Sequence, residues 1–204
     1  MVSKVDIVNR AATKLGDDRV LSLSDDTKVA RTFNSMYDIV RDAELRRNCW
    51  NFAVKRASIA ASITAPDWGF SYAYPLPSDF LRLLDIDGSW SDPGLDDYIS
   101  YDNSKFRIEG VGDIGKCIVT DMSAPLYVRY AAIVTDTNMY DSAFVEAFAC
   151  RLAYEACETL TQSNTKKSAL LGDYMMAVRE AIQSNAVENP ARAMPDDAWI
   201  MSRR

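Results

Sequence analysis

The 204-residue sequence contains no histidine. This absence excludes Ser-His-Asp and Cys-His catalysis, zinc sites with histidine ligands and acid–base chemistry by imidazole. Chemistry carried by carboxylate, lysine or tyrosine side chains stays open. Long apolar runs are missing too: no stretch reaches about 18 apolar residues, the length that a transmembrane helix needs. The first residues lack the apolar region of a signal peptide, so we expect neither a membrane anchor nor secretion.

Cysteine is scarce, with four residues and no C-x-x-C pair. Cys150 and Cys157 lie on one predicted helix, on the same face but two turns apart, which is too far for a disulfide. Buried, reduced cysteine is typical of proteins made in a reducing compartment. We therefore expect synthesis in the cytoplasm, from which the protein would leave only inside a particle.

Basic residues are outnumbered: 23 basic and 29 acidic side chains give a formal net charge of −6. Residues 49–137, with 7 basic and 12 acidic side chains, contribute −5 of this. Tight binding of nucleic acid needs lysine and arginine to neutralise phosphates, so the chain is a poor candidate for it. An acidic surface would suit a pore through which DNA slides, but solubility is the simpler explanation of the charge.

Apolar residues repeat at helical spacing in four segments. The predicted helices run over 3–15, from Asp25 or Asp26 as the cap to about 48, from Asp141 as the cap to a polar turn near 163, and over 164–188. Between the second and third helices the pattern becomes β-branched or alternating. These runs are 52–63, 68–77, 80–86, 98–101, 105–109, 117–121 and 126–130.

The pattern predicts an α+β fold. We expect an antiparallel helical bundle of about four long helices, an inserted small antiparallel β-sheet module and an extended C-terminal tail. The bundle would comprise residues 1–50 and 138–189, the β-rich module 51–137 and the docking tail 190–204.

Two segments imitate functional motifs. Residues 110–115 match G-x-G-x-x-G and, with Lys116, most of a Walker A loop. Both motifs need a helix directly after the loop, whereas a strand pattern follows here, and Cys117 stands where magnesium needs serine or threonine. We interpret the segment as a glycine-rich hairpin turn. A second segment is rich in aspartate but misses the EF-hand spacing, so we interpret it as a solvated loop: Asp85, Asp87, Asp92, Asp96 and Asp97.

The order of several segments along the chain resembles the tail tubular protein A family of short-tailed bacteriophages, also called head-to-tail adaptors. The segments are NCWNFA (48–53), YAYPLPSDFLR (72–82), FRIEG (106–110), APLYVRY (124–130), DSAFVEAFACRLA (141–153) and DDAWIMSR (196–203). The resemblance covers nearly the whole chain. No single segment is diagnostic; the combination and its order carry the resemblance.

The resemblance implies a structural virion protein at the head-to-tail junction, made in the host cytoplasm, with no catalytic residue, cofactor or metal. Usually twelve copies form a ring below the portal protein. The ring extends the DNA channel, through which double-stranded DNA passes without specific binding, and it anchors the tail nozzle and fibres.

Candidate contact residues follow from this reading. The tail is polar but ends in an apolar pair and two arginines, which indicates docking onto the portal or a neighbouring subunit: Trp199, Ile200, Arg203 and Arg204. Folding of the tail onto its own domain is equally consistent. Three further aromatic residues are candidate contacts to nozzle or fibre, although aromatic side chains on short strands more often belong to the core: Trp68, Phe70 and Trp90.

Three other readings stay open. One is a neck or head-completion protein of a longer-tailed phage, which is the same class of function in another particle. Another is a virion-associated murein hydrolase that uses carboxylates, for which no particular pair can be chosen from sequence. The last is a bacterial α+β binding module unrelated to phages.

Overall fold

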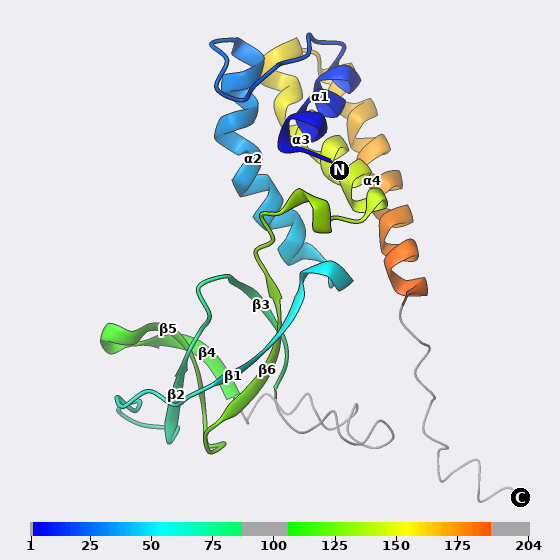
Figure 1. The fold of residues 1–204 in the computed structure, drawn as a ribbon. Coiled ribbons are helices and arrows are strands. Elements are labelled where there is room, and N and C mark those ends of the chain that lie inside the picture. The colour runs from blue at the N-terminus through cyan, green and yellow to red at the C-terminus, as the bar shows by residue number, and fades with distance from the viewer. Residues whose placement is uncertain (1, 87–105, 189–204) are drawn as a thin grey trace, which may run out of the picture. The chain divides into compact units, whose positions relative to one another are not determined.

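The computed structural model describes residues 2–86 and 106–188. These divide into two compact units. Within the described residues, the first unit contains the chain up to Ala53 and from Ala132 to residue 188 and holds the four α-helices. The second unit contains Val54–Ala131 and holds the strands (Figure 1). No helix within the described ranges has the length and apolar content needed to cross a membrane.

The helical unit contains α1 (Lys4–Leu15), α2 (Lys28–Arg47), α3 (Ser142–Thr161) and α4 (Asn164–Val187). Short 3-10 turns at Asn51–Ala53 and Thr137–Met139 accompany them. These bounds lie within about two residues of the four predicted helices, as expected where apolar periodicity and polar caps agree.

Capping residues fix the start and end of α1 and the start of α2. The Ser3 hydroxyl accepts a hydrogen bond from the Asp6 amide while the Asp6 carboxylate accepts one from the Ser3 amide, and Gly16 ends α1 in the left-handed conformation with φ 67°. The predicted cap of α2 was wrong: Thr27 caps it, by accepting from the Ala30 amide. Asp25 instead accepts hydrogen bonds from two amides of the preceding loop.

Helix α3 is the centre of the helical unit, packing against α1, α2 and α4 (Figure 1). Half of its 20 residues are buried, and many of these are small: Phe144, Val145, Ala147, Phe148, Ala149, Cys150, Leu152, Ala153, Ala156 and Cys157. A helix that is apolar over most of its circumference has to be surrounded by other helices. The alanines leave room for these neighbours to approach closely.

The predicted bundle of four long helices with one small inserted sheet is wrong. Helix α1 has only 12 residues, against 20 to 24 in the other three, and α3 is a central helix contacted by the rest. The β-rich part forms two three-stranded sheets. The class remains α+β. The error arose because helical periodicity shows which face is apolar but not how many neighbours cover it.

The β unit contains β1 (Val54–Ile59), β2 (Tyr72–Pro75), β3 (Phe80–Ile86), β4 (Phe106–Val111), β5 (Gly115–Thr120) and β6 (Leu126–Ala132). One sheet has the order β1-β6-β3 and the other β2-β5-β4. Strand β6 pairs antiparallel with β1, and β5 pairs antiparallel with both of its neighbours. The predicted strand at 98–101 lies outside the described residues.

The glycine-rich segment is a hairpin connection, as the sequence predicted. A 3-10 turn at Gly112–Ile114 joins β4 to β5, with Gly112 at φ 41° and Gly115 at φ 78°. The strand pair closes directly on this turn, with Val111 opposite Gly115. No helix follows the loop, so it lacks the row of helical amides with which nucleotide-binding loops hold phosphate.

Candidate interaction surfaces

The predicted contact residues are only partly within the described chain. Trp68 and Phe70 lie in the connection between β1 and β2, whereas Trp90 lies outside the described residues. The four predicted tail residues lie outside as well: Trp199, Ile200, Arg203 and Arg204. The structure therefore places two of the candidates, both in the β unit.

Trp68 and Phe70 have different environments although they are two positions apart. Phe70 is partly buried and packs against a small core cluster of the β unit, made of Ala73, Cys117 and Val119. Trp68 is 85% exposed. Phe70 thus belongs to the core of the β unit, as aromatic side chains on short strands usually do. Trp68 instead offers a large apolar ring to solvent, which is the typical anchor of a protein–protein contact.

The loop that carries Trp68 is anchored at both ends. Its last residue, Ser71, donates hydrogen bonds from its amide and its hydroxyl to Asp121 Oδ1, both at 2.8 Å. Near its start, the Ser62 amide donates to the Ala73 carbonyl oxygen at 2.8 Å. Ile63, on the same loop, is fully exposed. The two ends of the loop are therefore held, while two of its apolar side chains, Ile63 and Trp68, lie in solvent.

A second exposed surface lies on α4. The buried face of this helix is formed by Leu170, Tyr174, Val178 and Ala181. Other large apolar residues of the helix are exposed: Leu171, Met175, Met176, Ile182 and Val187. The sequence contained a signal for this surface, because α4 has apolar residues beyond the series Leu170, Tyr174 and Val178 that repeats every four positions and is buried. A helix with one buried face should be polar elsewhere, so this surplus indicates a further contact.

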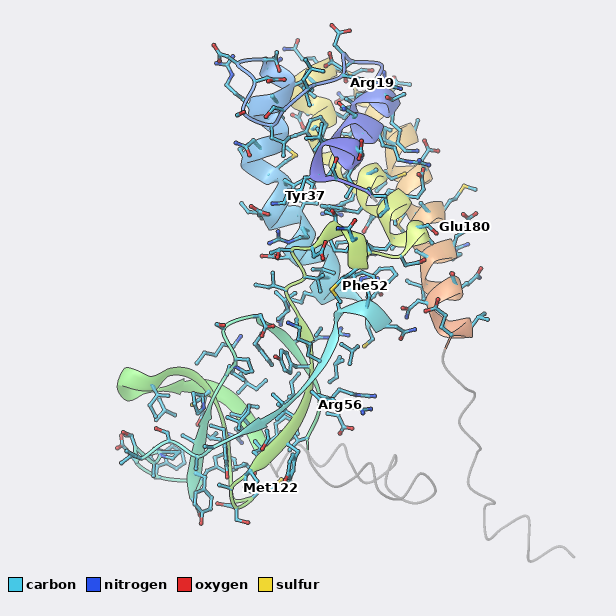
Figure 2. All side chains as sticks on the ribbon, in the orientation of Figure 1. Arg19, Tyr37, Phe52, Arg56, Met122 and Glu180 are labelled. Carbon is cyan, nitrogen blue, oxygen red and sulfur yellow. The ribbon has the colours of Figure 1, made fainter. Side chains whose placement is uncertain are left out.

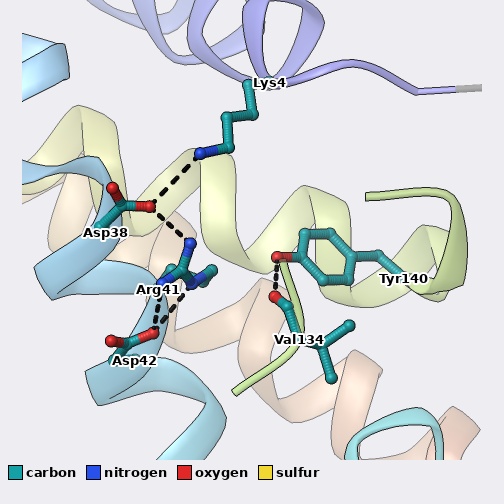
Figure 3. Close-up of polar contacts among 6 residues, drawn as sticks. All are labelled: Lys4, Asp38, Arg41, Asp42, Val134 and Tyr140. Atoms are coloured by element: carbon teal, nitrogen blue, oxygen red, sulfur yellow. Dashed lines mark hydrogen bonds and ion pairs between the residues drawn. The ribbon is translucent and has the colours of Figure 1, made fainter. Parts of the chain in front are cut away.

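Polar clusters inside the helical unit are structural. Arg41 on α2 is nearly buried, and its guanidinium donates to Asp38 Oδ1 at 2.5 Å and to Asp42 Oδ1 at 2.8 Å (Figure 3). Lys4 of α1 also contacts Asp38, at 3.4 Å. The Tyr140 hydroxyl donates to the Val134 carbonyl oxygen at 2.7 Å (Figure 3). A buried cation needs such partners, because leaving it uncompensated would cost several kcal/mol, on the order of 3–5.

Glu44 on α2 is the centre of a second buried cluster. Its Oε2 accepts a hydrogen bond from the Tyr174 hydroxyl of α4 at 2.8 Å, and Arg47 donates to that hydroxyl in turn. The guanidinium carbons of Arg47 and Arg151 lie 5.5 and 5.3 Å from the centroid of the Tyr174 ring. Burial raises the pKa of Glu44, although the Tyr174 hydrogen bond and the two arginines oppose it. Burial, followed by the charge of Glu44, raises the pKa of Tyr174 to about 12.

The raised pKa alone does not make Glu44 a catalytic acid. Its side chain is only 2% exposed and lies beneath Tyr174, so a polymeric substrate has no access to it in this conformation. Two other ion-paired carboxylates, Glu146 and Asp79, have a lowered pKa because their lysine, arginine and tyrosine partners outweigh burial. Within residues 2–86 and 106–188, no group of three or more cysteine, aspartate or glutamate side chains is arranged to hold a metal ion.

No protein-family model and no curated protein matches the chain.

Proposed function

We propose that the protein is a structural virion component, a head-to-tail adaptor of the tail tubular protein A type. Twelve copies form a ring below the portal protein of a tailed phage, extend the DNA channel and anchor the tail nozzle and fibres. The protein has no catalytic site and no cofactor in this role. Its place in the mature particle is the head-to-tail junction, after synthesis in the host cytoplasm.

The observation that carries the proposal is the presence of exposed apolar surfaces on both units. The α4 surface lies in the helical unit, and the loop surface of Ile63 and Trp68 lies in the β unit. A ring subunit needs one kind of contact to its neighbours and another to the proteins above or below it. Two apolar surfaces on separate units meet that requirement without any change in the fold.

The charge of the chain supports passage of DNA without retention. The 29 acidic side chains outnumber the 23 basic ones, and the resulting net charge of −6 disfavours tight binding of phosphates. A channel wall that bound DNA tightly would slow its movement at ejection. Glu44, whose pKa is raised by burial, is not available as the acid of a carboxylate hydrolase, because such an enzyme needs its acid at an open cleft.

Electron microscopy of the purified protein mixed with the portal protein of the same genome tests the proposal. We expect rings of the protein stacked on one end of the portal, with the symmetry visible in end views. A monomeric protein that does not associate with the portal would contradict the adaptor role. Clearing of a peptidoglycan suspension by the protein would instead establish the hydrolase.

A further inference from the structure

Helix α4 carries three exposed apolar side chains on one side, which we call the α4 stripe: Leu171, Met175 and Ile182. They are four and seven positions apart, so they lie within about 60° of one another around the helix, at about 100° per residue. Their exposed fractions are 40%, 47% and 41%. A line of apolar side chains with this spacing is the surface with which one helix packs against another.

Helix α2, in the same unit, has an exposed face of complementary shape. Ile39 is 72% exposed and points about 120° and 160° away from the buried Phe33 and Tyr37, at about 100° per residue. The residues one turn before and after it, Ser35 and Ala43, are exposed and small. One large side chain between two small ones leaves space for the larger side chains of a packed helix, as ridges of one helix fit between ridges of the other.

Helices α2 and α4 run in the same direction within one chain. Lys28, at the start of α2, donates a hydrogen bond to the Thr159 carbonyl oxygen near the end of α3 at 2.6 Å. Trp50, just after α2, packs against Phe144 near the start of α3, with ring centroids 5.0 Å apart. Helix α2 is therefore antiparallel to α3. Helix α4 is antiparallel to α3 as well, because a two-residue connection joins them and they pack together, and Figure 1 shows α2 and α4 on either side of α3.

This arrangement decides how two copies can meet. Rotation about a ring axis preserves the direction of every helix along that axis, so α4 of one copy would lie parallel to α2 of the next. A two-fold dimer would instead bring the same surface of both copies together, with α4 against α4.

Charge gives the parallel pair a register. Arg179 is exposed, lies about 40° to one side of Met175 and forms no ion pair within the described residues. Asp42 lies about 60° to the other side of Ile39. One carboxylate oxygen of Asp42 binds Arg41, and the other has no partner in the described part of the chain.

Opposite sides of two facing parallel helices meet, as the two flanking positions do in a parallel coiled coil, so Arg179 comes against Asp42 of the next copy. Arg179 is four positions after Met175. Asp42 is three positions after Ile39. The register that pairs the two charges therefore also sets Met175 opposite Ile39.

We propose that the α4 stripe binds α2 of a second copy of this chain, with Leu171 and Met175 packed beside Ile39 and Arg179 paired with Asp42. Each copy uses α4 toward one neighbour and α2 toward the other. Such a heterologous contact propagates from copy to copy and can close into a ring. The inference rests on the proposed adaptor function and deepens it, since it names the two surfaces that join neighbouring subunits.

Disulfide cross-linking of the full-length chain, alone and mixed with the portal protein, tests the contact. The background is Cys49→Ser, which removes the exposed thiol. Ile39→Cys is combined with Met175→Cys in one variant and with Met176→Cys in the matched control. Met176 is 65% exposed but points about 100° away from Met175 around the helix. We expect the Met175 pair to oxidise at least about tenfold faster, because thiols that face each other across a formed contact have a high effective concentration.

The size of the product separates the possible partners. A heterologous contact gives a ladder of linked multimers on a non-reducing gel, and neither cysteine alone gives any. A dimer from Met175→Cys alone would overturn the proposal, because α4 would then pack against α4. Equal rates for the two pairs, or no cross-link at all, would overturn it too. Circular dichroism before oxidation checks that the helices are intact.

Electron microscopy of the same samples distinguishes failure of this contact from failure of the adaptor role. Rings on the portal without the cross-link would overturn the contact and leave the adaptor role intact. A ladder of multimers that do not bind the portal would support the contact and contradict the adaptor role.

Discussion

Glu44 illustrates how a single buried side chain couples stability to pH. Its carboxylate has one hydrogen bond, from Tyr174, and its second oxygen accepts none within the described residues. Burial raises its pKa in the folded protein above the ordinary value of 4.5. The folded state therefore binds this proton more tightly than the unfolded chain does. Its contribution to stability is complete at low pH and is lost as the pH rises through the raised pKa.

The variant Glu44→Gln tests this coupling. The neutral amide keeps an oxygen for the Tyr174 hydroxyl but cannot ionise, so the variant should gain stability relative to the wild type as the pH rises from about 4 to 7. Urea unfolding at several pH values measures the difference. Glu180→Gln is the control for the loss of one carboxylate charge, since Glu180 is exposed on α4 (Figure 2). Parallel curves for Glu44→Gln and the wild type would contradict the prediction.

Helix α4 contains a glycine that nothing in the described chain requires. Gly172 lies in the helix interior, and a methyl group added there would meet no atom within 4 Å. Its φ is not in the left-handed region, in contrast to that of Gly16. Glycine in a helix interior is less favourable than alanine by about 0.5–1 kcal/mol, because the unfolded chain loses more conformational freedom.

Gly172→Ala should therefore raise the free energy of unfolding by about 0.5–1 kcal/mol, measured by thermal or urea denaturation. Gly16→Ala is the opposite case. Gly16 ends α1 in the left-handed conformation, with φ 67°, so alanine at this position should lower the free energy of unfolding by about 1 kcal/mol. A loss of stability at position 172 would mean that the added methyl group is not accommodated on α4.

At the scale of the whole molecule, a substitution in the loop that carries Trp68 should change assembly without changing folding. The indole side chain of Trp68 is 85% exposed and makes few contacts within the monomer. Trp68→Ala should therefore leave the stability of the protein unchanged within about 0.5 kcal/mol. If the loop contacts the tail nozzle, the variant should still form rings on the portal but bind the nozzle protein at least about tenfold more weakly, as expected for a central aromatic anchor.

Pull-down of purified nozzle protein by portal–adaptor rings measures this effect. Leu21→Ala is the matched control, because Leu21 is 93% exposed and belongs to the helical unit rather than to the β unit that carries Trp68. Undiminished nozzle binding by Trp68→Ala would remove the loop from the interface. Loss of the rings themselves would instead place Trp68 between subunits.

Local sequence determined the elements of this protein but not their partners. Helical periodicity and the Ser3 and Gly16 caps located α1, and alternation located β6, because these signals depend on neighbours a few positions apart. Tertiary structure decided that β6 lies between β1 and β3, that Phe70 is covered while Trp68 is not, and that Glu44 is buried against Tyr174, 130 positions along the chain. Such pairings depend on which distant surfaces meet, and no local pattern encodes that choice.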